Sequence, residues 1–187
     1  MSAKLVQWLQ ALDASQFASA TLINNAAALP KISSLEHADF DNIAQAMRVN
    51  LETPMQLTAA FLGATGNWPA ERKVLNISSG NGRRAMASAS IYSAAKAGMD
   101  HYTRCVALEE AARPNGAKLC ALAPGIIDTD MQTHLRATDP ADFPSHATFV
   151  SFKDNGDLLT PEAAAKRVLN YLARADFGSN PVGDVRD

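Results

Sequence analysis

Helical and β-rich segments alternate along this chain of 187 residues, and this alternation restricts its fold more than any other feature. Some segments repeat hydrophobic residues at helical spacing, and others are short β-rich runs bounded by turn residues. The patterns predict helices at residues 3–14, 39–63, 91–112 and 161–175, and strands at 21–24, 73–77, 117–123 and 182–185. Such an order is typical of an α/β domain whose parallel sheet has helices on both faces.

Residues 126–160 show neither pattern, so we expect an irregular region that contributes to substrate binding. No repeat or low-complexity linker divides the chain, and residues 1–187 are interpreted as one domain. The two cysteines, Cys105 and Cys120, are expected to be reduced core thiols of a cytoplasmic protein.

The composition argues against several classes of function. The net charge is −2, which gives no general reason to expect nucleic acid or an anionic membrane as a partner. The chain has no run of 18 apolar residues, and its N-terminus lacks the basic and apolar regions of a secretory signal. The four histidines show no ligand spacing, so no metal site is expected.

Polar or turn-forming residues follow three of the predicted strands. Asn25, Ser79 and Pro124 each come just after a strand. The carboxyl ends of parallel strands meet at one edge of a sheet, where ligands bind. We therefore expect these three residues to converge on one crevice.

A tyrosine and a lysine on the predicted helix at 91–112 have the chemistry of a proton donor. Tyr92 and Lys96 lie four residues apart and therefore share a face of the helix. An ammonium near the phenol would lower its pKa from about 10 towards neutrality, which would make Tyr92 a usable acid. Ser79 stands thirteen residues before Tyr92 and would hold the reacting oxygen.

These residues resemble the classical branch of the short-chain dehydrogenase/reductase family. The matching pieces occur in the family's order between residues 22 and 129: Asn24-Asn-Ala-Ala27, Asn50, Ser79, Tyr92-x-x-x-Lys96 and Pro124-Gly-x-x-x-Thr129. The C-terminal third resembles sepiapterin reductases and their benzil-reducing bacterial relatives. The thirteen-residue gap disfavours the extended branch, which acts on sugar nucleotides. The resemblance implies a Rossmann-like, doubly wound parallel sheet.

The resemblance also implies a role for each matching residue. Tyr92 would protonate a carbonyl oxygen as hydride arrives, Ser79 would hydrogen-bond that oxygen, and Lys96 would lower the pKa of Tyr92 and hold the cofactor ribose. NADP(H) is the expected cofactor, with NAD(H) as the alternative. The implied cofactor-binding residues are Asn25, Ala26, Ala27, Tyr92, Lys96, Pro124, Gly125, Ile127 and Thr129.

Asn50 would complete the catalytic set by offering its backbone carbonyl to a proton-relaying water. Proline lacks an N–H, so Pro54 cannot donate to that carbonyl as a regular helical residue would. This observation favours the relay independently of the resemblance. A plain helix kink is the competing explanation of the proline.

The implied substrate is a small carbonyl compound, either a sepiapterin-like pterin or an α-diketone. Besides Ser79 and Tyr92, its contacts would be Met131 and Asp184, whose carboxylate would bind the amino end of a pterin. A solvated acid near the chain end is the alternative for Asp184. Pocket lining and core packing are both open for Met131 and for three phenylalanines: Phe143, Phe149 and Phe152.

Family members begin with a strand, a Gly-rich turn and a helix that bind pyrophosphate, and nothing like these precedes Leu22. We therefore interpret the chain as an N-terminally truncated form in which the first three strands are absent. Two functions follow: an NAD(P)H-dependent carbonyl reductase, or a catalytically weak or inactive fragment that acts as a binding or oligomerisation module. The resemblance implies a homodimer or homotetramer formed through the helices at 39–63 and 91–112.

Overall fold

The computed structural model describes residues 2–187, which form a four-stranded sheet packed between helices. The strands lie in the order β1-β2-β3-β4, and every neighbouring pair is parallel. This arrangement confirms the α/β fold. Within residues 2–187, β1 pairs with β2 alone. The bounds of the strands are Ser19–Asn24 (β1), Glu71–Ile77 (β2), Lys118–Ala123 (β3) and Val182–Asp184 (β4).

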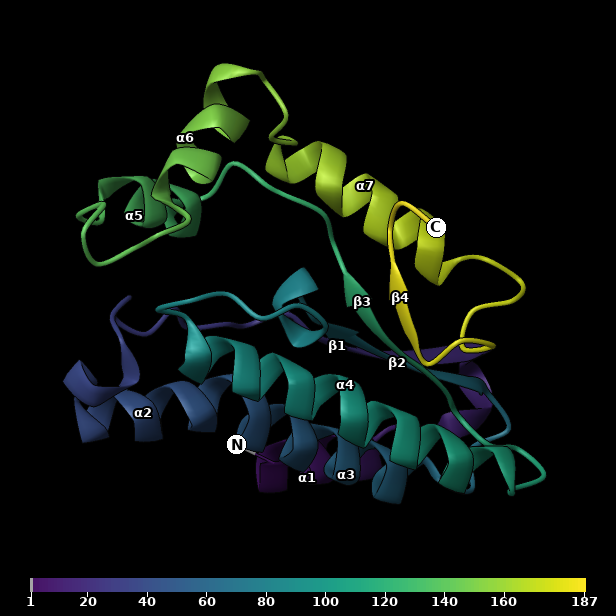
Figure 1. The fold of residues 1–187 in the computed structure, drawn as a ribbon. Helices are drawn as coiled ribbons and strands as arrows, with labels where there is room; N and C mark the ends of the chain where they lie inside the picture. Colours follow the sequence, from purple (N-terminus) through teal and green to yellow (C-terminus); the bar gives the residue numbers. More distant parts are fainter. Residues whose placement is uncertain (1) are drawn as a thin grey trace.

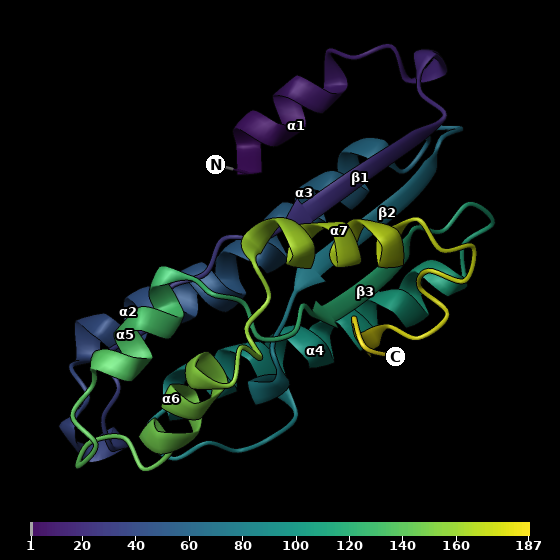
Figure 2. The same ribbon diagram turned by 90° about the horizontal axis from the view of Figure 1, so that it is seen from above.

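Helices cover both faces of the sheet (Figure 1). Helices α1 (Ser2–Gln10), α3 (Thr53–Thr65) and α4 (Ser90–Ala111) lie on one face, and α7 (Pro161–Leu172) lies on the other. Seen from above, α1 lies beside the β1 edge and α7 crosses the middle of the sheet (Figure 2). Short 3-10 turns complete the chain at Ala14–Gln16 (η1), Leu35–His37 (η2) and Gly80–Gly82 (η4).

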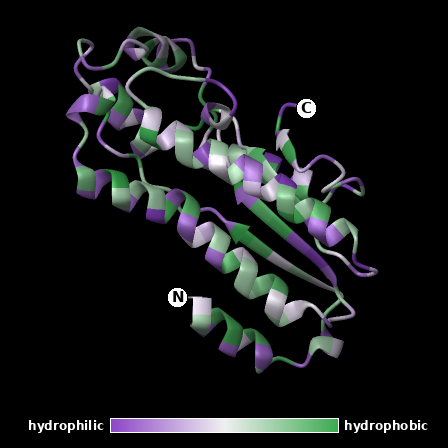
Figure 3. Cartoon of the chain, turned by 60° about the horizontal axis from the view of Figure 1, so that its bottom comes forward, coloured by the Kyte–Doolittle hydropathy of each residue, from purple (hydrophilic) through white to green (hydrophobic). Residues whose placement is uncertain are grey.

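Consecutive strand residues are buried on opposite sides of the sheet. Val74 is fully buried in the cluster that includes α1 and α3 residues, and the next residue, Leu75, is fully buried in the cluster with Val168 of α7. Consecutive side chains of a strand point to opposite faces, so a strand covered on both faces is apolar at successive positions. Figure 3 shows green, hydrophobic stretches in the strands beside purple, hydrophilic ones, and helices of mixed character.

The segment predicted as an interrupted helix at 39–63 has three parts. Helix α2 (Phe40–Met47) leads into a π-helical turn at Arg48–Glu52, and α3 follows with Pro54 in its first turn. Thr53 donates its N–H to the carbonyl of Arg48, which is the longer hydrogen bond of a π-helix. Since Pro54 has no N–H, it cannot continue the hydrogen bonds of a regular α-helix. The helix is therefore interrupted next to Pro54, as the sequence predicts.

The prediction of an irregular region at 126–160 is wrong. The region contains α5 (Asp130–Ala137) and α6 (His146–Asp154), which lie together beyond the carboxyl end of the sheet (Figure 1). Helices this short carry few repeats of an apolar pattern, so periodicity did not reveal them. A bridge between Ile127 and Leu159 closes the region at its base.

Two further expectations concern the cysteines and the membrane. Cys120 is buried as predicted, whereas Cys105 is exposed on α4, so it is not a core thiol; both thiols are free. In the part of the chain that the structure describes, no helix is both long and apolar enough for a membrane span.

Candidate active site

A cavity of about 610 Å³ opens at the carboxyl ends of the strands. Its wall includes Ile77, Ala123 and Asp184, which end β2, β3 and β4. Most of the predicted site residues line this cavity, as the strand-end argument anticipated. They are Asn25, Ala27, Ser79, Tyr92, Lys96, Pro124, Gly125, Ile127, Thr129, Met131 and Asp184. Of the predicted residues, which all fall within 2–187, Ala26 and Asn50 are outside the wall.

The proposed proton donor and its neighbours come together in this cavity. Tyr92 lies in the first turn of α4 and is 8% exposed, and Lys96 one turn later is 1% exposed. The Lys96 Nζ lies 5.7 Å from the centre of the Tyr92 ring and donates to the carbonyl oxygen of Ile77 at 2.7 Å. The ammonium is therefore fixed at the end of β2, beside the phenol.

Burial dominates the pKa values of this pair. It raises the pKa of Tyr92 above its ordinary value, and a hydrogen bond with Ser79 opposes the shift. The lowering of the Tyr92 pKa expected from the Tyr-Lys spacing is not what the structure shows, because burial penalises the charged phenolate. Burial lowers the pKa of Lys96 to about 8, and the Asp100 carboxylate opposes that change. At neutral pH both the phenol and the ammonium keep their protons.

A buried carboxylate that the sequence analysis missed lies beneath the Ser79 turn. Asp100 is 1% exposed and accepts a hydrogen bond from the Ser78 hydroxyl. Its Oδ2 atom has no partner among residues 2–187 and lies 2.7 Å from the position that a Cβ on Gly82 would occupy. Burial raises the pKa of this carboxyl. One feature of the sequence could have revealed Asp100: it lies four residues after Lys96, on the same face of α4.

Asn50 organises the segment that follows β1. Its side-chain Oδ1 accepts the N–H of Ala28 at 3.0 Å, and its Nδ2 donates to the Ala28 carbonyl at 2.7 Å. The side chain is fully buried within the π-helical turn. Asn50 therefore fixes the backbone next to Asn25 and Ala27, and the role of its own carbonyl in a proton relay stays a prediction.

Ala27, Gly125 and Thr129 bring backbone groups to the cavity wall where the predicted cofactor would bind. Among residues 2–187, Ser88 is the only non-glycine residue with positive φ. Ala27 therefore does not have positive φ, and its position does not require a glycine. Gly125, in contrast, has φ +87°. Thr129 precedes α5, and its side chain makes no capping bond. The hydroxyl and the first N–H groups of α5 are thus available for a phosphate or an amide oxygen.

Asp184 lies in the cavity wall, but arginines occupy its carboxylate. Its Oδ1 accepts from Arg186 Nε at 2.7 Å, and its Oδ2 accepts from Arg186 Nη2 at 2.6 Å. Arg83 Nη2 lies 3.8 Å from the same Oδ2. These hydrogen bonds from Arg186 hold the pKa of Asp184 below its usual value. With 6% exposure, the residue is not the solvated acid of the alternative interpretation.

The aromatic candidates divide between cavity and core. Met131, Phe149 and Phe152 line the cavity, whereas Phe143 is fully buried in a core cluster. The wall also contains polar residues that sequence reasoning missed, namely Asn81, Arg84, Gln132 and Arg186. Each lies within five residues of a predicted site residue in the sequence, but no motif or spacing pattern marks it.

Comparison with known proteins gives matches in sequence and in fold. Residues 4–140 match the family described as short chain dehydrogenase. The benzil reductase ((S)-benzoin forming) of Bacillus cereus is 37% identical over 164 residues, which cover 88% of this chain and 65% of that protein. The sepiapterin reductase of Xenopus tropicalis is 29% identical over 169 residues, covering 89% and 63% respectively.

A solved structure extends the match to the fold. The crystal structure of a short chain dehydrogenase/reductase from Saccharomyces cerevisiae has a TM-score of 0.80 at 22% identity, and the match covers 100% of this chain and 74% of that chain. The chain thus spans 65% of the Bacillus cereus relative and 63% of the Xenopus tropicalis relative.

Proposed function

This chain belongs to the short-chain dehydrogenase family, and on that premise we propose that its cavity reduces a ketone to an alcohol with hydride from NAD(P)H. One observation carries the proposal: Ser79, Tyr92 and Lys96 line a single cavity at the carboxyl ends of the strands. A hydroxyl, a phenol and an ammonium are the groups that hold a carbonyl oxygen and protonate it.

The side chains divide the reaction between them. A nicotinamide cofactor, held by Gly125, Ile127 and Thr129 in the cavity wall, would supply hydride to the carbonyl carbon. Tyr92 gives its phenolic proton to the carbonyl oxygen, because its raised pKa keeps it protonated at neutral pH. Ser79 hydrogen-bonds the same oxygen, and the Lys96 ammonium, which is protonated below a pH of about 8, stabilises the phenolate left on Tyr92.

Reprotonation of Tyr92 completes the cycle. In the proposal, the Asn50 backbone carbonyl holds a water that passes protons from solvent towards Lys96. Two features support this role: Pro54 has no N–H to occupy that carbonyl, and the π-helical turn at Arg48–Glu52 displaces the chain from the regular pattern.

The cavity favours an α-diketone over a pterin. Met131, Phe149 and Phe152 provide apolar contacts for flat or aromatic substituents. A pterin would need the Asp184 carboxylate, which Arg186 already binds with two hydrogen bonds. NADP(H) is the proposed cofactor, with NAD(H) as the alternative. The similarity to a benzil reductase supports an α-diketone substrate, and the similarity to a sepiapterin reductase supports the pterin alternative.

A second candidate function is assembly without catalysis. Large apolar side chains are exposed on the helices that were predicted to join subunits: Phe40 on α2 is 85% exposed, Met55 on α3 is 45% exposed, and Leu108 on α4 is 76% exposed. Exposed apolar side chains of this size favour association with another chain. The observation supports a binding or oligomerisation module.

Cofactor titration distinguishes the two candidates. NADPH fluorescence is titrated with the 187-residue chain, and NADPH oxidation is then followed with benzil, for the wild type and for Tyr92→Phe. A reductase binds NADPH in both forms, and the Tyr92→Phe variant loses about 100-fold or more in turnover. A wild-type chain that forms oligomers but neither binds NADPH nor consumes it would support the assembly function instead.

A further inference from the structure

The charged side chains in the cavity wall are mostly cations. Among the described residues of the wall, Arg84, Lys96 and Arg186 are positive and Asp184 is the single acid. The whole chain carries a net charge of −2, so the positive charge is a local excess. An excess of one sign inside a cleft raises the local concentration of ligands of the opposite sign.

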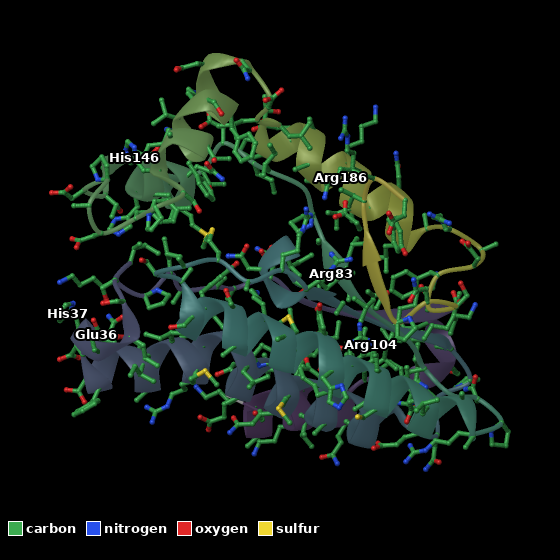
Figure 4. The ribbon with its side chains drawn as sticks, viewed as in Figure 1. Glu36, His37, Arg83, Arg104, His146 and Arg186 are labelled. Atoms are coloured by element: carbon green, nitrogen blue, oxygen red, sulfur yellow. The ribbon has the colours of Figure 1, made fainter. Side chains whose placement is uncertain are left out.

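Asp184 offsets only one of these three positive charges, that of Arg186, so Arg84 and Lys96 remain as the excess. Both of its oxygens are bonded to Arg186, and Arg83 approaches the same carboxylate. Figure 4 shows Arg83 and Arg186 in the space between α4 and α7. One carboxylate is thus shared between two guanidinium groups. Arg84 has no ion pair with any carboxylate of residues 2–187.

The guanidinium of Arg84 lies over the turn that presents Ser79. Its Nη2 atom is 3.6 Å from the position that a Cβ on Gly80 would occupy, and Gly80 is the residue after Ser79. The backbone N–H of Arg84 donates to the Gly80 carbonyl at 2.9 Å, and this hydrogen bond closes the turn. Arg84 is therefore placed beside Gly80, in the same cavity wall as the Ser79 hydroxyl that would hold the substrate oxygen.

A guanidinium is a fork of N–H donors that matches a carboxylate with two parallel hydrogen bonds. A neutral diketone offers no group that uses this fork. A 2-oxo acid offers a carboxylate directly beside its ketone, so one small molecule presents one group to Ser79 and another to Arg84. The remaining wall, with Met131 and Phe149, accepts an apolar substituent on the other side of the ketone.

We propose that the substrate of this cavity is a 2-oxo acid with an apolar or aromatic substituent, whose carboxylate is bound by Arg84 while Ser79 and Tyr92 hold the ketone oxygen. Arg186 is paired with Asp184, so the second uncompensated positive charge in the same wall is that of Lys96. The proposal rests on the proposed function for the reaction, whereas binding of the acid requires no hydride and is measured separately.

The test compares two ligands of nearly equal shape by isothermal titration calorimetry. Phenylglyoxylate carries the carboxylate, and its methyl ester lacks the charge. We expect the wild-type chain to bind the acid about 10- to 100-fold more tightly than the ester, and to lose most of that preference in Arg84→Gln. Arg84→Lys keeps the charge without the fork and should retain part of the preference.

Arg48→Gln is the matched control. Arg48 and Glu52 are exposed residues of the π-helical turn that pair with each other, and Arg48 lies outside the cavity wall. The loss of Arg48 should therefore leave the preference for the acid over the ester unchanged. Equal binding of acid and ester by the wild type, or a preference that survives Arg84→Gln, would overturn the proposal. Acid binding through Arg84 without NADPH-dependent reduction of any ketone would contradict the proposed function and leave this inference standing.

Discussion

Lys96 combines almost complete burial with a positive charge at neutral pH. Its pKa is about 8 in the folded chain and near 10.5 in an unfolded one, because burial penalises the ammonium. Between these pH values the unfolded chain keeps a proton that the folded chain has lost. Raising the pH therefore favours the folded state in this window, and below pH 8 the effect is constant.

The variant Lys96→Met tests this contribution of Lys96 to stability, through the difference between its free energy of unfolding and that of the wild type. From pH 8 to 10.5, the free energy of unfolding of the wild type should rise by up to about 3 kcal/mol relative to the variant. Urea denaturation at several pH values measures the difference, and the titration of the remaining groups cancels between the two proteins. A difference that stays flat, or falls, across this window would contradict the account of Lys96.

Asp100 is predicted to act on Lys96 as a positioning residue. Its carboxylate attracts the ammonium, and the other charged groups that act on Asp100 are Arg83 and Arg104. Asp100→Asn removes the attraction and should bring the pKa of Lys96 below about 8. Titration of ¹³C-labelled lysine by NMR measures that value. Asp41→Asn, on exposed α2, is the control that should leave it unchanged.

Single residues were predictable where type and spacing coincide. Tyr92, Lys96 and Ser79 were found because they lie at fixed separations on one helix and one strand end. Asp100 was missed since its importance depends on a contact across the fold with Ser78, and Arg84 was missed since no motif or spacing marks its position beside Gly80. The burial of the Tyr92 phenol, which decides the direction of its pKa shift, is likewise a property of the assembled cavity.

At the scale of elements, the π-helical turn connects helix packing to the cavity. Asn50 holds Ala28 with two hydrogen bonds, so Asn50→Ala leaves a backbone N–H and a carbonyl without partners. We expect a loss of about 1–3 kcal/mol in the free energy of unfolding and faster hydrogen exchange at Ala28. Asn42→Ala removes a comparable but exposed bond to Lys31 and should cost less. Equal costs for the two variants would contradict a structural role for Asn50.

The strands were more predictable than the short helices. Strands β2 and β3 are buried on both faces, so each contains a short apolar run, Val74-Leu75 in β2 and Leu119 to Ala123 in β3. Helices α5 and α6 are held instead by contacts between distant residues, such as the buried cluster of Leu135 and Phe143, against which Phe149 of α6 packs. Such contacts leave no periodic signal, and the region was read as irregular for that reason.

At the scale of the whole molecule, the exposed apolar residues of α2 and α4 predict assembly. We expect the wild-type chain to be a dimer or a tetramer by light scattering, and the double variant Phe40→Ser, Leu108→Ser to be smaller with unchanged circular dichroism. Leu169→Ser on α7, where the leucine is 54% exposed, is the control for a general effect of removing apolar surface. A monomeric wild type would exclude assembly through these helices.

The central claim is that Tyr92, Ser79 and Lys96 form the proton-donating half of a hydride-transfer site. NADPH carrying deuterium at the transferred position is incubated with the 187-residue chain and benzil, and the benzoin is analysed by mass spectrometry, which detects slow turnover. The account predicts deuterium in the product of the wild type and about 100-fold less in Tyr92→Phe. A wild type that transfers no deuterium, or a Tyr92→Phe variant that transfers as much, would contradict the claim.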